Sequence, residues 1–202
     1  MDLQPLLEKS SCDHAHLCPR QILGVRMGLA GLETLGFAAA SEKKRLLVIV
    51  ETDGCFVDGL IAATGCTVGH RTLRVEDYGK TAASFVDTAT GQAVRLAPAP
   101  GIREKAFIYT PNEPRHYFAQ MQAYQVMPMA EMFTFSPVTL TQSLAALLSR
   151  PGIRTNCDLC GEEIMNEREI RRDGITLCLP CARGGYCQFQ EQNVLFSYSL
   201  TE

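Results

Sequence analysis

The sequence lacks the segments that carry a protein into or across a membrane. Its N-terminus has no basic stretch followed by an apolar run, which a secretory signal peptide would need. No window reaches the roughly 20 apolar residues of a membrane-spanning helix, and the most apolar stretch, residues 22–35, is interrupted by Gly and Arg. We therefore expect a soluble, cytoplasmic protein with no membrane partner.

Several cofactor and nucleic-acid signatures are also missing. The chain has no P-loop, no dinucleotide-binding glycine fingerprint and no four-cysteine ferredoxin run. It also has no internal repeat or low-complexity segment. Its formal net charge of −3 gives no general attraction to nucleic acid. What is left is a chain of 202 residues, 46% of them apolar, which is long enough for a hydrophobic core.

Cysteine, in contrast, is abundant, with nine residues in the chain. Disulfides are a poor explanation in a reducing compartment. Four of the cysteines form two Cys-x-x-Cys pairs, and a fifth ends a His-x-His-x-Cys run. This spacing indicates metal ligation.

Hydrophobic periodicity predicts an α+β domain at residues 1–150, with a mixed sheet packed against helices, followed by a zinc-finger domain and tail at 151–202. The segment 149–152, Ser-Arg-Pro-Gly, marks the boundary. Helices are expected within residues 1–11, from Pro19 to a C-cap at Gly36, and at 57–64. A further helix is expected within 113–126, ending at about Val126. Strands are expected within 45–51, 72–77, 80–91, 92–98 and 135–140.

Glycine is unusually frequent in the helix that begins at Pro19. Gly24, Gly28 and Gly31 lower its helix propensity. They are tolerable only if another backbone packs close to them.

The two Cys-x-x-Cys pairs predict a structural zinc ion. Two such turns complete a tetrahedral shell of four thiolates, and a closed shell is structural rather than catalytic. Gly161 allows a tight knuckle, Asp173–Gly174 is a hairpin signal, and a helix is expected near the second pair, as in a treble-clef or ribbon finger. The ligands are Cys157, Cys160, Cys178 and Cys181.

The charge of this finger argues against nucleic-acid binding. From residue 151 onward the chain has five Arg, no Lys and eight Asp or Glu, a local net charge of −3. Phosphate binding is disfavoured, and a role in packing or dimerisation is the better expectation.

A second candidate site lies near the N-terminus. In an extended segment, His14, His16 and Cys18 would project to the same face, just before the helix at Pro19. Imidazole and thiolate together suit zinc, iron, nickel or copper. A chance cluster near a surface turn is the alternative.

More polar side chains follow the buried strand at 45–51. Cys55 comes directly after it, and strand ends are where sites form in α/β-like sheets. Asp58, Cys66 and His70 follow closely. Ordinary roles remain open, since Asp58 would also suit a helix cap and Cys66 would also fill a core.

These motifs resemble the FmdE family, the E component of formylmethanofuran dehydrogenase, over roughly residues 8–140. The matching motifs are His-x-His-x-Cys-Pro, the Asp-Gly-Cys…Asp-Gly…Thr-Gly-Cys-Thr-x-Gly block, and Asp-Tyr-Gly-Lys at 77–80. Some members carry a similar four-cysteine finger. The resemblance implies an α+β fold, a homodimer and a metal pocket built from these motifs.

The resemblance also implies ligands for a second metal ion, zinc, iron or nickel. His16, Cys18 and Cys55 are the leading candidates, followed by His14 and Cys66.

Three further residues take roles at the presumed pocket. Asp58 would position a ligand or transfer protons, His70 would shuttle protons, and Lys80 would attract an anionic substrate unless it is a solvated strand-end lysine. The chain departs from the family pattern at two positions. Arg20 follows Cys-Pro where many relatives have Gly, and His70 stands where others have Lys.

The family is named for an operon association with a molybdenum or tungsten oxidoreductase that interconverts carbon dioxide and a formyl group in methanogenesis. The resemblance therefore implies an accessory subunit of such an enzyme. Two alternatives stay open. One is an independent enzyme with an open zinc or iron site that acidifies a bound water. The other is a carrier of metal or sulfur.

Overall fold

The protein is described here by a computed structural model that covers residues 2–37 and 44–187. The chain divides into two compact units, Met1–Leu144 and Ala145–Glu202, whereas the sequence suggested a boundary at 150/151. None of the helices within the covered ranges combines the length and the apolar character needed to cross a membrane.

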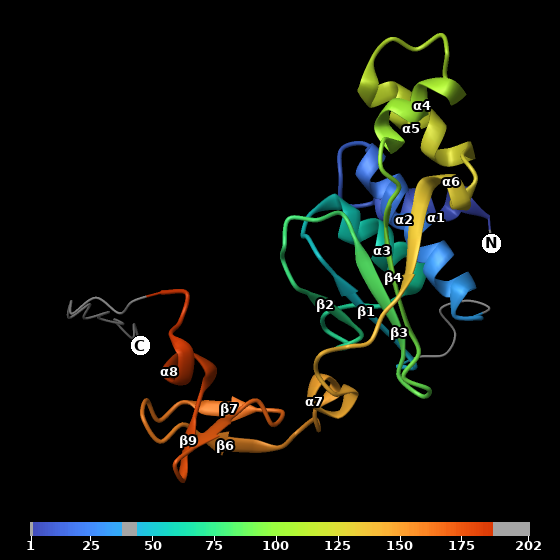
Figure 1. Ribbon diagram of the computed structural model, residues 1–202. Helices are drawn as coiled ribbons and strands as arrows, with labels where there is room; N and C mark the ends of the chain where they lie inside the picture. Colours follow the sequence, from blue (N-terminus) through green and yellow to red (C-terminus); the bar gives the residue numbers. More distant parts are fainter. Residues whose placement is uncertain (1, 38–43, 188–202) are drawn as a thin grey trace, which may run out of the picture. The chain divides into compact units, whose positions relative to one another are not determined.

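A five-stranded mixed sheet forms the centre of the first unit (Figure 1). Its strand order is β2-β1-β3-β4-β5. β1 and β2 are parallel, and all other neighbours are antiparallel. The strands are β1 Leu46–Val50, β2 Leu73–Val75, β3 Ala83–Asp87, β4 Ala93–Pro98 and β5 Phe133–Pro137. The predicted α+β class with a mixed sheet is confirmed.

Six helices accompany this sheet in the described part of the first unit. They are α1 Leu3–Ser10, α2 Pro19–Thr34, α3 Cys55–Thr64, α4 Ile102–Tyr109, α5 His116–Val126 and α6 Met129–Met132. The sequence did not predict α4, because it buries only Ile102 and Ala106 and therefore has little apolar periodicity. A further short helix, α7, spans Leu144–Leu148.

Glycines bring α2 and α3 into backbone contact. A Cβ added to Gly24 would lie 2.2 Å from the carbonyl oxygen of Phe56. One turn further along, a Cβ on Gly28 would lie 2.6 Å from the Cβ of Ala63. Later residues of α2 thus meet later residues of α3, so the helices run in parallel and their N-termini lie at the same end.

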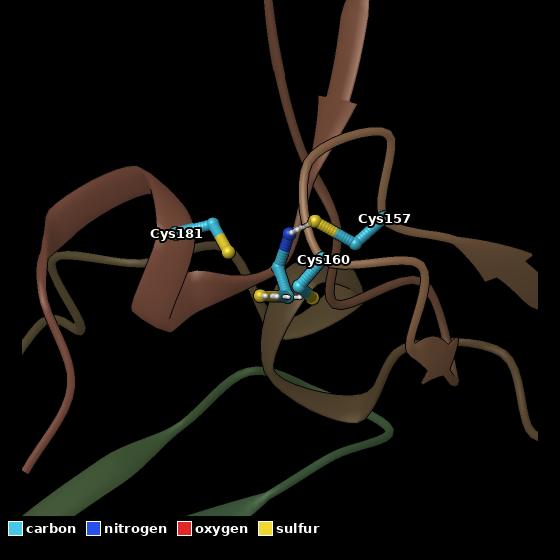
Figure 2. A group of neighbouring side chains, drawn as sticks. Cys157, Cys160 and Cys181 are labelled. Carbon is cyan, nitrogen blue, oxygen red and sulfur yellow. Dashed lines mark hydrogen bonds between the residues drawn. The ribbon is translucent and has the colours of Figure 1, made fainter. Parts of the chain in front are cut away.

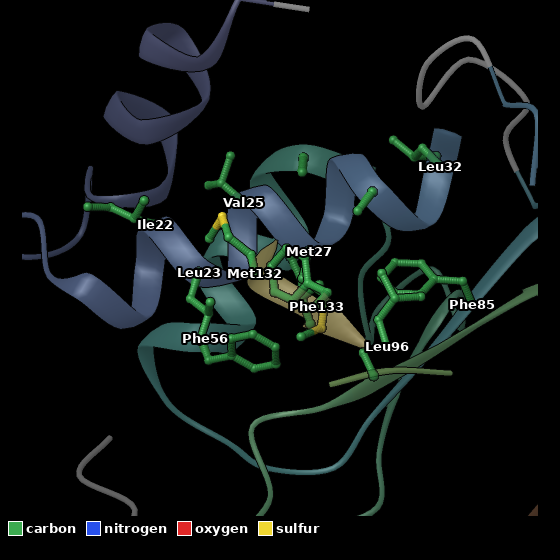
Figure 3. Close-up of a cluster of buried hydrophobic side chains, with 14 of the residues drawn as sticks. Ile22, Leu23, Val25, Met27, Leu32, Phe56, Phe85, Leu96, Met132 and Phe133 are labelled. Carbon is green, nitrogen blue, oxygen red and sulfur yellow. The ribbon is translucent and has the colours of Figure 1, made fainter. Parts of the chain in front are cut away.

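The main core lies between these helices and the sheet (Figure 3). Ile22 and Val25 of α2 and Phe56 of α3 are almost fully buried. Phe85 and Leu96 contribute from the sheet. Full burial of side chains of this size contributes about 1.5–3 kcal/mol each, so the core fixes how α2 and α3 lie against the strands.

The second unit contains two small hairpins and a short helix. β6 Arg154–Asn156 pairs with β7 Glu163–Met165, and β8 Ile170–Arg172 pairs with β9 Ile175–Leu177. Asp173 and Gly174 both have positive φ, 52° and 82°, as a two-residue hairpin turn requires. The helix α8 covers Leu179–Arg183.

Candidate metal centres

Four thiols converge in the second unit (Figure 2). Cys157 and Cys160 lie on the knuckle between β6 and β7, while Cys178 caps the start of α8 and Cys181 lies within it. The four sulfur atoms all lie within 4.8 Å of one another. This arrangement matches the tetrahedral cage that a zinc ion takes with four thiolates.

Backbone groups prepare this cage for a cation. The Cys178 N–H donates to Cys157 Sγ over 3.3 Å. The N–H groups of Cys160 and Cys178 lower the pKa of the Cys157 thiol to about 6, because they favour the thiolate. The neighbouring thiol of Cys178, followed by burial, raises the pKa of Cys181 to about 12. Without a metal, the cluster therefore resists full ionisation, and a divalent cation relieves that repulsion.

Two hydrogen bonds hold the knuckle against β9. The Asp158 N–H donates to the Thr176 carbonyl over 2.8 Å, and the Thr176 N–H donates to Asp158 Oδ2 over 2.6 Å. The associated core is small, with Cys157, Ile164 and Leu177 as its buried residues. A core of this size rarely stabilises a fold unaided, so the metal supplies folding free energy.

A second group of donors gathers where α2 and α3 begin. Cys18 is the N-cap of α2, and Cys55 is the first residue of α3. Gly54 turns the chain into α3 with φ 78° and ψ −163°, a conformation essentially restricted to glycine. Burial raises the pKa of the Cys18 thiol, and negative charge on Cys55 raises it further. The two thiols are therefore close enough to influence each other's ionisation.

Buried hydrogen bonds fix the position of Cys18. Its N–H donates to Gln21 Oε1 over 2.8 Å, and Gln21 Nε2 donates to the Ser10 carbonyl over 2.7 Å. Gln21 is fully buried. The end of α1 and the start of α2 are thus joined through a single side chain, which limits the freedom of the Cys18 thiol.

Tyr117 of α5 also approaches the two thiols. Its hydroxyl donates to the Leu17 carbonyl over 3.3 Å. Burial raises the pKa of Tyr117, and charges on Cys18 and Cys55 raise it further. Sequence reasoning missed this residue, since no spacing pattern links it to positions 18 and 55.

The structure places the two N-terminal histidines differently from one another. His14 Nε2 lies 2.9 Å from Asp58 Oδ2, in the first turn of α3, while His16 is exposed. The run from His14 to His16 is bent, whereas an extended run was expected. The segment turns instead, with the His14 N–H donating to the Ser11 carbonyl over 3.0 Å.

The N-terminal donors are less tightly gathered than those of the finger. Within residues 2–37 and 44–187, the finger cysteines are the one set of three or more His, Cys, Asp or Glu whose ligand atoms all lie within 4.8 Å of each other. His14, His16, Cys18 and Cys55 do not form such a set. A second metal ion at this position stays a proposal.

Cys66 and His70 lie away from this group. Cys66 follows the far end of α3, about 15 Å along the helix from Cys55. It is buried, with its thiol 3.6 Å from the Leu46 carbonyl. His70 Nδ1 lies 2.9 Å from Thr67 Oγ1, also beyond that end. The structure thus gives Cys66 the core-filling role.

Lys80 lies at the opposite end of β1, the end from which the chain enters α3. Its N–H donates to the Glu51 carbonyl over 3.0 Å, and its side chain is exposed. Lys80 therefore shares with Cys55 the end of the strand where sites are expected.

Comparison with known proteins identifies both units. The model of the family described as "FmdE, Molybdenum formylmethanofuran dehydrogenase operon" matches residues 14–134. The chain belongs to the FmdE family. In this FmdE protein, the "Prokaryotic dksA/traR C4-type zinc finger" family matches residues 152–185, which include all four cage cysteines. The predicted family and zinc finger are confirmed.

A curated relative and a solved structure are also similar to this FmdE chain. A "Probable S-adenosyl-L-methionine-binding protein" of Archaeoglobus fulgidus is 40% identical over 97 residues, which cover 46% of this chain and 26% of that protein. The chain therefore matches only about a quarter of that relative's length.

The solved structure is an FmdE-like protein from Syntrophus aciditrophicus, named for a tungsten formylmethanofuran dehydrogenase. It superimposes with a TM-score of 0.54 at 20% identity, covering 93% of this chain and 96% of that one. At this level of identity, the match shows a shared fold.

Proposed function

We propose that this FmdE protein binds a second metal ion where α2 and α3 begin, with Cys18, Cys55 and His16 as ligands. We further propose that it acts as a homodimeric accessory subunit of a molybdenum or tungsten enzyme of one-carbon redox metabolism. The observation that carries the metal proposal is that two thiols close enough to influence each other stand at the starts of two parallel helices.

Helix geometry makes this pair suitable for a soft metal ion. Each helix N-terminus carries a partial positive charge, which favours thiolates over thiols. Burial has the opposite effect on the Cys18 thiol and raises its pKa. A cation bound between the two sulfur atoms would offset that cost, and zinc, iron and nickel all accept thiolate and imidazole ligands.

His14 supports the site through Asp58. A metal-bound histidine usually donates its other ring N–H to a carboxylate, which fixes the ring. The 2.9 Å contact between His14 Nε2 and Asp58 Oδ2 has that form and leaves Nδ1 for a metal. His16 is exposed two residues before Cys18, so it has the freedom to turn toward the two thiols.

The accessory role is supported by the relatives. The family description refers to a molybdenum formylmethanofuran dehydrogenase operon, and the structural neighbour is named for a tungsten formylmethanofuran dehydrogenase. Stable co-purification with a molybdenum or tungsten protein from the native source would be the expected result. Isolation of this chain only as free homodimers would contradict the accessory role.

A second candidate is an independent metal-dependent enzyme, and the His14–Asp58 pair favours it. A metal with three protein ligands keeps a position for water and lowers the pKa of that water to about 7. The Asp58 carboxylate and the His14 ring, joined over 2.9 Å, would accept and pass on its proton. A readily exchanged metal would instead indicate a carrier.

Metal analysis by mass spectrometry tests the metal proposal. The intact protein should hold about two metal equivalents, and the variant with His16→Ala and Cys18→Ala should lose about one while keeping the zinc of the finger. Cys66→Ala is the matched control, since this thiol lies in the core and should not affect the count. An unchanged metal content in the double variant would rule out the second site.

A further inference from the structure

A pocket of about 120 Å³ opens beside the start of α2. Its wall combines apolar side chains from α2, β4 and α4 with polar groups from four segments of the first unit. The polar groups are those of Arg20, Thr81, Arg103, Gln120 and Tyr124. All five can donate hydrogen bonds, and the two arginines are donors only.

Two helices begin at this pocket. Pro19 and Arg20 are the first two residues of α2, and Ile102 and Arg103 are the first two of α4. No side chain caps α4, which follows Gly101 with φ 73°. The positive ends of two helix dipoles, each with an arginine at its second position, therefore face one small volume, which favours an anion.

Neither arginine is neutralised by an ion pair. In the described part of the chain, the ion pairs involve other residues and leave the guanidinium groups of Arg20 and Arg103 without a carboxylate. Glu104 is the nearby acid, and its carboxylate folds back to within 4.0 Å of the Cβ position of Gly101. Two guanidinium groups and one carboxylate leave a net positive charge.

Tyr124 supplies the second, independent indication of a ligand. This residue is only 2% exposed, yet among the described residues no group hydrogen-bonds to its hydroxyl. Burial raises its pKa to about 12, and the charge of Arg103 acts in the opposite direction. The hydroxyl is therefore a neutral donor near Arg103. It is not among the fully buried unpartnered atoms of the described residues, so it keeps access to the pocket that Tyr124 lines.

We propose that this pocket binds a small organic carboxylate. Arginine pairs with carboxylates through two parallel N–H bonds, and the Tyr124 hydroxyl would donate a further bond. The apolar part of the wall, including Leu23 and Ile102, suits a short carbon chain rather than a fully polar phosphate. A pocket of about 120 Å³ suits a ligand of only a few carbon atoms.

This inference goes beyond the proposed function and does not require the second metal. Pro19 lines the pocket and directly follows Cys18. A bound carboxylate would thus lie beside the proposed metal site.

Titration of the full-length, ¹⁵N-labelled protein with sodium acetate and sodium propionate, followed by NMR at constant ionic strength, tests the proposal. Saturable shifts are expected at the amides of Arg20, Thr81 and Arg103. Arg20→Gln and Arg103→Gln should each weaken binding about tenfold through loss of a charge-assisted bond. Arg168→Gln, the same change on an exposed finger residue, should leave the affinity unchanged.

Tyr124→Phe gives a milder probe that keeps the buried ring. It should weaken acetate binding severalfold without changing the rest of the spectrum. Shifts that do not saturate, equal weakening by Arg168→Gln, or equally tight binding of inorganic phosphate would each overturn the proposal. Metal content measured on the same samples separates the two ideas. If protein that holds only one metal equivalent still binds acetate, the carboxylate pocket is supported and only the second metal site is ruled out.

Discussion

Gly24 of α2 and Gly59 of α3 lie directly against each other's helix backbone. A Cβ on Gly24 would lie 2.2 Å from the Phe56 carbonyl oxygen, and a Cβ on Gly59 would lie 2.3 Å from that of Gln21. Because the helices are parallel, this contact also sets the separation of their first residues. The packing of two glycines therefore determines how close Cys18 and Cys55 come.

Gly24→Ala should destabilise the protein even though alanine favours helix. The propensity gain is about 1 kcal/mol, whereas a methyl group forced between two backbones costs about 1–3 kcal/mol or more. We expect a net loss and a lower denaturant midpoint in urea unfolding. Gly69→Ala is the control, since nothing lies within 4 Å of its Cβ position. A Gly24→Ala variant at least as stable as the parent would contradict the close packing.

Cys160→Ser should remove the zinc of the finger and unfold the second unit only. Loss of one thiolate opens the cage, and the small core around Ile164 and Leu177 does not replace the metal. Zinc analysis should show the loss of about one equivalent. NMR signals of the finger should collapse, while those of residues in α2 and β1 stay in place. Retained finger signals in zinc-free protein would disprove the structural role of the ion.

Asp87→Asn should lower stability near neutral pH and matter less in acid. Arg45 donates to both carboxylate oxygens of Asp87, over 3.0 and 2.9 Å, and these bonds hold its pKa well below the usual range. A depressed folded-state pKa stabilises the protein above the unfolded pKa of about 4, and that contribution is lost as pH falls below it. Urea midpoints of the variant and parent should thus converge in acid.

The exposed Asp53 provides the control for this pH dependence. Asp53→Asn should leave the urea midpoint nearly unchanged at each pH, because this side chain has no comparable partner among the described residues. A difference between Asp87→Asn and the parent that stays constant down to pH of about 3 would show that the effect is not due to ionisation.

Arg95→Met should be far more damaging than the same change at Arg154. Arg95 forms two hydrogen bonds, of 2.5 and 2.7 Å, with the carboxylate of Glu51. The Glu51 side chain is only 11% exposed, so removing its partner leaves a buried charge and costs about 3–5 kcal/mol. The pair of Arg154 with Glu163 lies at the surface, with side chains 61% and 46% exposed, where loss costs about 1 kcal/mol or less. Similar denaturant midpoints for both variants would refute this difference.

Local pattern predicted much of the fold. The β-branched run at 45–51 became β1, Pro128 ended the helical pattern that forms α5, and Asp173–Gly174 formed the hairpin turn. In each case a few adjacent residues specify the backbone conformation. The helix α4 escaped prediction because its two buried side chains give no clear period.

The zinc cage was determined by the sequence itself, because each Cys-x-x-Cys turn brings two thiolates together locally and only one hairpin connects the two turns. The positions of the N-terminal donors relative to one another, in contrast, depend on tertiary structure. Cys18 meets Cys55, and His14 meets Asp58, only because α2 and α3 pack in parallel through Gly24 and Gly59. The same packing leaves Cys66 at the far end of α3. Spacing along the chain carries no information on such contacts, since they depend on how two helices cross.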